Sequence, residues 1–269
     1  MVIAALVWRN WRRGVVLNLD MKRSLLAIAG AVALCGLLPA AADATITELG
    51  ATTSPLIAPA CPKGVAPSQC TIILTRATAL ETIRDNIAYP SKVKKAGRIV
   101  AFTVGLSALS TSASTALSDT KFLDKTYGGD AQIALTVLKP VGKKTAWTWS
   151  VIAQSPMVDV QPYLGQVVQF PLTTSIPVVR GETIALTTPT WAPVLTIDLS
   201  TNHFAYRQSR GGSYPRASVG TLCGLPPSTS QAQTSVGEST AYVCDYPGTR
   251  VEYSATEVTN PVANTTTTK

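Results

Sequence analysis

The sequence predicts an all-β protein, an antiparallel β-sandwich of jelly-roll type with at most one short helix. Beyond residue 70, short runs rich in β-branched residues are separated by Gly, Pro and polar clusters, a pattern typical of a sandwich or barrel. Helical periodicity is nearly absent. In the run 131–139, Ile133, Leu135 and Val137 alternate with other residues, so one face of this strand is expected to be buried and the other wet.

The expected strands are residues 71–77, 97–106, 131–140, 145–154, 165–170, 182–188, 194–199 and 249–255. Glycines in 126–130 and 179–182 supply the positive φ that turns between strands require. Residues 78–87 are expected to form the one helix, because Thr78 and Glu81 have capping-box spacing. The same segment could instead extend the preceding strand.

Residues 21–44 have the features of a bacterial export signal. Lys22 and Arg23 precede an uncharged apolar run, and Ala42-Asp43-Ala44 matches the pattern that signal peptidase cleaves. Residues 1–20 are best explained as an upstream mis-start of translation, with a long basic leader as the alternative. The expected mature chain has a Pro-rich segment at 45–70, a sandwich domain at 71–258 and a disordered Thr-rich tail at 259–269. The protein is expected to be secreted or to lie on the cell envelope.

Charge excludes some classes of partner. The full sequence carries +8, and without residues 1–44 it has 18 basic and 13 acidic residues, a net charge of +5. Lys92, Lys94, Lys95 and Arg98 form the one dense basic cluster. No aromatic residue interrupts it, so nucleic-acid binding is not expected. It is either a solvated loop or a surface that attracts anionic wall polymers or lipid head groups. No apolar run is long enough for a transmembrane helix.

Four cysteines lie beyond residue 44, an even number that suits an oxidising compartment. We predict the pairs Cys61–Cys70 and Cys223–Cys244, because each closes a short loop rich in turn-forming residues. A zinc site is the competing interpretation, but the chain has no C-x-x-C motif and only one histidine. No metal and no cofactor is therefore expected.

Three consecutive segments carry a resemblance to a known group of proteins. The order "AQIALTVLKP", "WSVIAQSP" and "FPLTTSIPVVRGETIALTT" resembles an arrangement in secreted, functionally uncharacterised jelly-roll-like β-sandwich proteins of actinobacteria. The resemblance covers about residues 95–200. It implies the fold only, because that group has no activity to carry over.

Aromatic residues supply the candidate ligand contacts. Trp191 lies between prolines after a strand, and Tyr206, Arg207 and Tyr214 belong to the Gly-rich segment "FAYRQSRGGSYPR", so a loop location is expected for all four. Trp147 is the fifth candidate. It shares one strand face with Trp149, which is how a stacking platform for sugars is built and also how a core is filled.

The sequence contains no recognisable catalytic motif. His203 is the one histidine, and no G-x-S-x-G motif accompanies it. No stretch singles out a pair of carboxylates. Asp119, Asp124 and Asp130 cluster but lack EF-hand spacing.

The sequence therefore favours a secreted, non-catalytic binding or envelope-associated module whose partner is a cell-wall glycan or another extracellular ligand. The alternative is an extracellular hydrolase that acts on wall polysaccharide or ester bonds.

Overall fold

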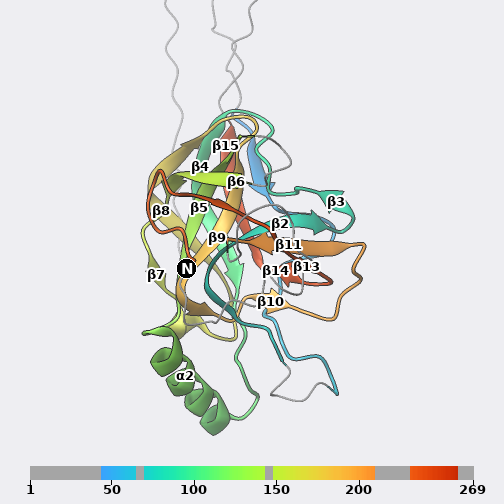
Figure 1. Ribbon diagram of the computed structural model, residues 1–269, viewed down its shortest axis with the longest axis vertical. Coiled ribbons are helices and arrows are strands. Elements are labelled where there is room, and N and C mark those ends of the chain that lie inside the picture. The colour runs from blue at the N-terminus through green and yellow to red at the C-terminus, as the bar shows by residue number, and fades with distance from the viewer. Residues whose placement is uncertain (1–43, 65–69, 143–147, 210–230, 260–269) are drawn as a thin grey trace, which may run out of the picture. The chain divides into compact units, whose positions relative to one another are not determined.

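Antiparallel strands make up most of the fold, in agreement with the prediction of an all-β protein (Figure 1). The computed structural model describes residues 44–64, 70–142, 148–209 and 231–259. The predicted leader up to residue 43 and the tail from residue 260 lie outside the described residues. So do Trp147, Tyr214 and Cys223.

The smaller sheet has four strands in the order β1-β15-β4-β8. They are β1 (Ile46–Leu49), β15 (Tyr253–Thr259), β4 (Gly97–Gly105) and β8 (Val167–Val178). Strand β8 contains Pro171 and Pro177 and lies at the sheet edge, where a missing backbone N–H is tolerated. Strand β1 belongs to the Pro-rich segment, and its Ile46 pairs with Val258. The segment 45–70 therefore contributes a strand to the domain.

The larger sheet has nine strands, seven of them in the order β12-β6-β5-β9-β2-β11-β13. Their bounds are β12 (Ser239–Ala241), β6 (Thr148–Gln154), β5 (Gln132–Val141), β9 (Thr183–Ala192), β2 (Leu74–Arg84), β11 (Phe204–Gln208) and β13 (Cys244–Pro247). Strand β3 (Ile87–Ala88) pairs with β2, and β7 (Val158–Asp159) pairs with β5. A separate ladder joins β10 (Leu195–Thr196) to β14 (Arg250–Val251). A short 3₁₀ turn, η3, spans Gln161–Tyr163.

The main core lies between the two sheets. The larger sheet curls into a half-barrel and packs against the smaller one. Phe102 and Val104 of β4 and Leu135 and Val137 of β5 belong to this core and have no exposed surface. The alternation predicted for Ile133, Leu135 and Val137 is confirmed. Burial of apolar side chains at this interface stabilises the sandwich by about 25 cal/mol per Å².

The outer face of the larger sheet is also buried, so the expectation of a wet face is wrong. Residues 231–233 lie against it and hold it through a chain of polar contacts. Thr187 Oγ1 lies 2.6 Å from Thr136 Oγ1 and 2.9 Å from Thr78 Oγ1. The backbone N–H of Gln233 donates to Thr78 Oγ1 at 3.0 Å, and Gln154 Nε2 donates to the Gln233 carbonyl at 2.9 Å. A row of threonines predicts a solvated face unless another segment supplies hydrogen-bonding partners.

The helix expected at 78–87 is wrong. Residues up to Arg84 continue β2, which pairs with β9 on one side and β11 on the other. Asp85 and Asn86, with φ of 50° and 63°, then turn the chain back into β3. Two consecutive positive φ values are typical of a tight hairpin turn. Ladder bonds on both edges outweigh the local capping-box spacing.

The α-helix of the described residues lies elsewhere, at α2 (Ala113–Tyr127), 15 residues long. The Ser112 side chain caps its first turn, and Gly128, with φ of 90°, ends it in the left-handed conformation. Leu123 is its one buried residue. Figure 1 shows α2 beside the strand ends rather than across a sheet face. The predicted turns at Gly128 and Gly181 both have positive φ, and the first of them ends a helix.

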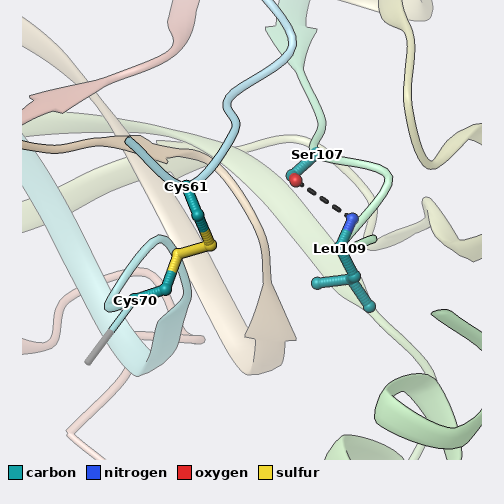
Figure 2. The surroundings of a disulfide bond; sticks show 4 residues. All are labelled: Cys61, Cys70, Ser107 and Leu109. Atoms are coloured by element: carbon teal, nitrogen blue, oxygen red, sulfur yellow. Dashed lines mark hydrogen bonds between the residues drawn. A yellow bond between two sulfur atoms is a disulfide. The ribbon is translucent and has the colours of Figure 1, made fainter. Parts of the chain in front are cut away.

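The predicted bridge between Cys61 and Cys70 is present, with 5.6 Å between the two Cα atoms. It lies near the loop that carries Ser107 and Leu109, where the Leu109 N–H donates to Ser107 Oγ at 3.0 Å (Figure 2). Cys244 is buried on β13. Its pairing with Cys223 remains a prediction, because Cys223 is outside the described residues.

Candidate ligand-binding groove

A groove of about 250 Å³ opens between β2, β10, β11 and β13. We call it the tyrosine groove. Its lining combines hydroxyl and amide groups with apolar side chains and includes no charged residue. The lining residues are Thr71, Ile73, Leu74, Thr75, Leu195, Ile197, Tyr206, Gln208, Tyr246 and Thr249. Polar, uncharged groups predominate in this lining, and such groups fix the orientation of a neutral ligand through hydrogen bonds.

Two tyrosines form the aromatic wall of the tyrosine groove. Tyr206 of β11 and Tyr246 of β13 are directly opposite each other in the ladder. Their rings stack with centroids 4.8 Å apart and planes 14° from parallel. Tyr206 is 3% exposed, whereas Tyr246 is half-buried. Gln208 Nε2 donates to the Tyr246 hydroxyl, so the pair is held in place and Tyr246 presents the accessible surface.

Strand geometry separates two of the sequence candidates. Residues 204–208 form β11, so the loop expected there is wrong for Tyr206 and Arg207. Successive side chains of a strand point to opposite faces. Tyr206 lines the groove, whereas Arg207 donates to the Tyr242 carbonyl at 3.1 Å and pairs with Asp245 at 3.3 Å. Arg207 is 4% exposed, so its role is to hold these two neighbours in place.

Trp191 is not in a loop, and this expectation is also wrong. It lies in β9 and has no exposed surface. Its Nε1 donates to Asp124 Oδ1 at 3.0 Å and to the Gly129 carbonyl at 3.2 Å. The indole therefore fastens the C-terminal end of α2 to the sheet. A ligand cannot reach it in this conformation.

Trp149 packs on the outer face of the larger sheet. Its ring centroid lies 6.3 Å from that of Tyr89, and both contact the cluster of Leu80, Leu138 and Tyr242. Trp149 therefore fills a small core, as one of the two interpretations predicts. Trp147 and Tyr214 remain untested as ligand contacts, because both are outside the described residues.

Sequence reasoning missed Tyr246, Gln208 and Thr249 of the tyrosine groove. Tyr246 and Thr249 follow Cys244, but only the pairing of β11 with β13 brings them beside Tyr206. The period-2 spacing of Tyr206 and Gln208 was the one available signal that they share a face.

His203 lies in an exposed turn, where its backbone N–H donates to the Ser200 carbonyl at 3.0 Å. Among the residues that the structure describes, its imidazole has no hydrogen-bond partner. A general base for a serine nucleophile needs such a contact to an orienting group.

Two acidic side chains lie close together in the interior. Glu81 Oε2 is 3.4 Å from Arg84 Nη1, and Glu252 Oε2 is 3.1 Å from Arg250 Nη2. Both glutamates have no exposed surface. Burial raises the pKa of Glu81 to about 8, against the opposing effect of Arg84. Burial likewise raises the pKa of Glu252 to about 7, although Thr196 donates to it. A substrate cannot reach this pair, so its role is structural.

These two carboxyl groups give the protein a pH-dependent stability. Below about pH 4.5 they are protonated in both the folded and the unfolded state, so they do not lower the free energy of unfolding. As the pH rises towards 8, the unfolded state ionises first and the free energy of unfolding falls. Urea denaturation at pH 5, 6, 7 and 8 should show this fall. Glu81→Gln should make the free energy of unfolding depend less steeply on pH. An unchanged pH dependence in that variant would contradict the raised pKa of Glu81.

The described residues contain no group of three or more His, Cys, Asp or Glu side chains placed to hold a metal ion. Asp119 and Asp124 lie in α2, and Asp124 accepts from Trp191 and from Gln161 Nε2 at 3.3 Å. Across the same residues, no helix has the length and apolar character needed to span a bilayer.

Comparison with family models, curated proteins and solved structures found no match to this chain in any of the three.

Proposed function

We propose that the protein is an exported, non-catalytic binding module whose tyrosine groove takes a neutral carbohydrate. The observation that carries this proposal is the lining of the groove, which combines stacked tyrosines with threonine hydroxyls and one amide and no charge. Sugars present apolar C–H faces together with hydroxyl groups. A half-buried aromatic ring beside neutral hydrogen-bonding groups complements both.

Export is supported by the leader-like residues 21–44 and by the Cys61–Cys70 bridge. Disulfides persist in oxidising compartments outside the cytosol. The envelope of the producing cell is then the nearest source of glycan, so we propose a wall polysaccharide as the ligand class.

A jelly-roll topology, and with it the likeness to secreted actinobacterial sandwiches, is part of the same proposal. Its support is that neighbours in both sheets are antiparallel and often distant in sequence. Strand β15 lies between β1 and β4, and β2 lies between β9 and β11. Long connections of this kind are typical of Greek-key arrangements.

A neutral-glycan array followed by calorimetry on the best ligand tests the proposal. Tyr246→Ala should weaken binding at least about 5-fold, because removing an aromatic anchor from a site costs about 1–3 kcal/mol. Tyr163→Ala is the matched control. Tyr163 is 39% exposed and lies on η3, outside the groove, and its loss should leave affinity unchanged.

No binding to any neutral glycan, or equal affinity for wild type and Tyr246→Ala, would overturn the groove assignment. Release of reducing sugar during the assay, abolished by His203→Ala, would instead favour the hydrolase.

A further inference from the structure

A second pocket lies where β1 meets β15, and it shares no lining residue with the tyrosine groove. The Thr259 N–H donates to the Thr45 carbonyl at 2.9 Å and closes this end of the sheet. The pocket has a volume of about 220 Å³, and the basic cluster of the sequence supplies part of its wall. Lys92, Lys94 and Lys95 line it together with the hydroxyl-bearing residues Thr45, Thr47 and Thr259. We call it the lysine pocket.

The positive charge of the lysine pocket is not neutralised by ion pairs. All three lysines are exposed. Within the described part of the chain the ion pairs are Arg84–Glu81, Arg207–Asp245 and Arg250–Glu252, so none involves a lysine. Arg98, in neighbouring β4, donates to the Ser175 hydroxyl at 2.6 Å and to its carbonyl at 2.9 Å. Both partners are neutral, so the charge of Arg98 is also uncompensated.

Two acidic residues line the same pocket, and both are engaged within the protein. Glu48 accepts from the hydroxyls of Ser254 at 2.5 Å and Thr256 at 2.8 Å. Glu257 is 2% exposed and accepts from the Thr47 hydroxyl at 3.2 Å. Burial raises the pKa of Glu257, which favours its neutral form. Three lysines against these two glutamates leave the lysine pocket with an excess of positive charge.

We propose that the lysine pocket binds an anionic polymer with repeated phosphate diesters. Lysine ammonium groups donate strong charge-assisted hydrogen bonds to phosphate oxygens. A pocket of about 220 Å³ accommodates one phosphate group with its neighbours along a chain.

A polymer fits this arrangement better than a membrane surface, because the cations surround a recess and a bilayer presents a broad face. The proposal adds a site to the proposed function and does not depend on the tyrosine groove. Neutral glycans test that groove, whereas charged probes test the lysine pocket, so either can fail alone.

The test uses poly(glycerol phosphate), inorganic phosphate and vesicles containing phosphatidylglycerol as probes of the purified protein. Wild type should bind the polymer at least 10-fold more tightly than inorganic phosphate, and affinity should fall with added salt. Replacing Lys92, Lys94 and Lys95 together by Gln should weaken polymer binding at least 10-fold. The matched control replaces Lys121, Lys125 and Lys139, three exposed lysines outside the pocket, and should weaken it less than 3-fold.

The six substituted side chains are exposed, so both variants should melt at the wild-type temperature. Equal losses in the two variants would show attraction by net charge alone and overturn the site. No polymer binding at low salt would also overturn it, and tighter binding to vesicles than to polymer would assign the pocket to a membrane instead.

Discussion

Replacing Arg84 by Met is expected to lower the free energy of unfolding by about 3–5 kcal/mol, because breaking a buried ion pair leaves its partner unpaired. Arg84 is 1% exposed, and its Nη1 contacts Glu81 Oε2 at 3.4 Å and the Tyr253 carbonyl at 3.2 Å. The substitution leaves both acceptors in the dry interior. Urea denaturation at pH 9, above the raised pKa of Glu81 and therefore with the pair ionised, measures the loss.

A double variant distinguishes this cause from a packing defect. Glu81→Leu combined with Arg84→Met removes both partners, and it should cost less than Arg84→Met alone. A cost below 1 kcal/mol for the single variant would contradict the structural role of Arg84. A double variant as costly as the sum of the two single variants would show that the residues act independently.

Replacing Trp191 by Ala is expected to destabilise the fold by about 3–5 kcal/mol, the usual cost of deleting a large buried aromatic side chain. Trp191 is the largest of the fully buried side chains and holds Asp124 of α2 through its Nε1. The helix should also lose its attachment to β9. Thermal unfolding measures the first effect, and hydrogen exchange of the α2 amides measures the second.

Trp191→Phe is the matched control, since it keeps most of the apolar volume and removes the indole N–H. It should cost about 1–3 kcal/mol, because Asp124 and the Gly129 carbonyl lose a donor. Faster exchange in α2 should persist in this variant. Wild-type exchange and stability in Trp191→Ala would contradict the role of the indole as the anchor of the helix.

The features that sequence reasoning predicted correctly depend on short-range patterns. The alternation of Ile133, Leu135 and Val137 marks a strand with one face in the core, and all three are buried there. The spacing of Cys61 and Cys70 permits a short loop, and the bridge is present. Gly181 allows the turn between β8 and β9. Each of these properties is set by a few neighbouring residues.

Other elements depend on contacts distant in sequence. Residues 78–84 have helical spacing, but β9 and β11 supply hydrogen bonds on both edges and make them a strand. Strand β9 runs through Pro189 to Trp191, because the ladder with β2 is irregular at Thr75–Ala77 and needs no N–H from a proline there. The expectation of a loop at Trp191 was wrong for this reason.

Helix α2 was missed because it has one buried residue and so shows little amphipathic pattern. Its ends carry the usable signals, Ser112 as the N-cap and Gly128 as the left-handed C-cap. In the tyrosine groove, Tyr206 could be singled out from sequence, whereas Tyr246 needed the register of β11 against β13. A binding surface made from paired strands is specified by that register.

The measurement that tests the binding proposal most directly is an NMR titration of isotopically labelled protein with soluble fragments of wall polysaccharide. Binding at the tyrosine groove predicts the largest shifts at Gln208, Tyr246 and Thr249, with no new anomeric signals from the sugar over hours. Shifts centred on His203 together with new anomeric signals would contradict the proposal and show a hydrolase instead.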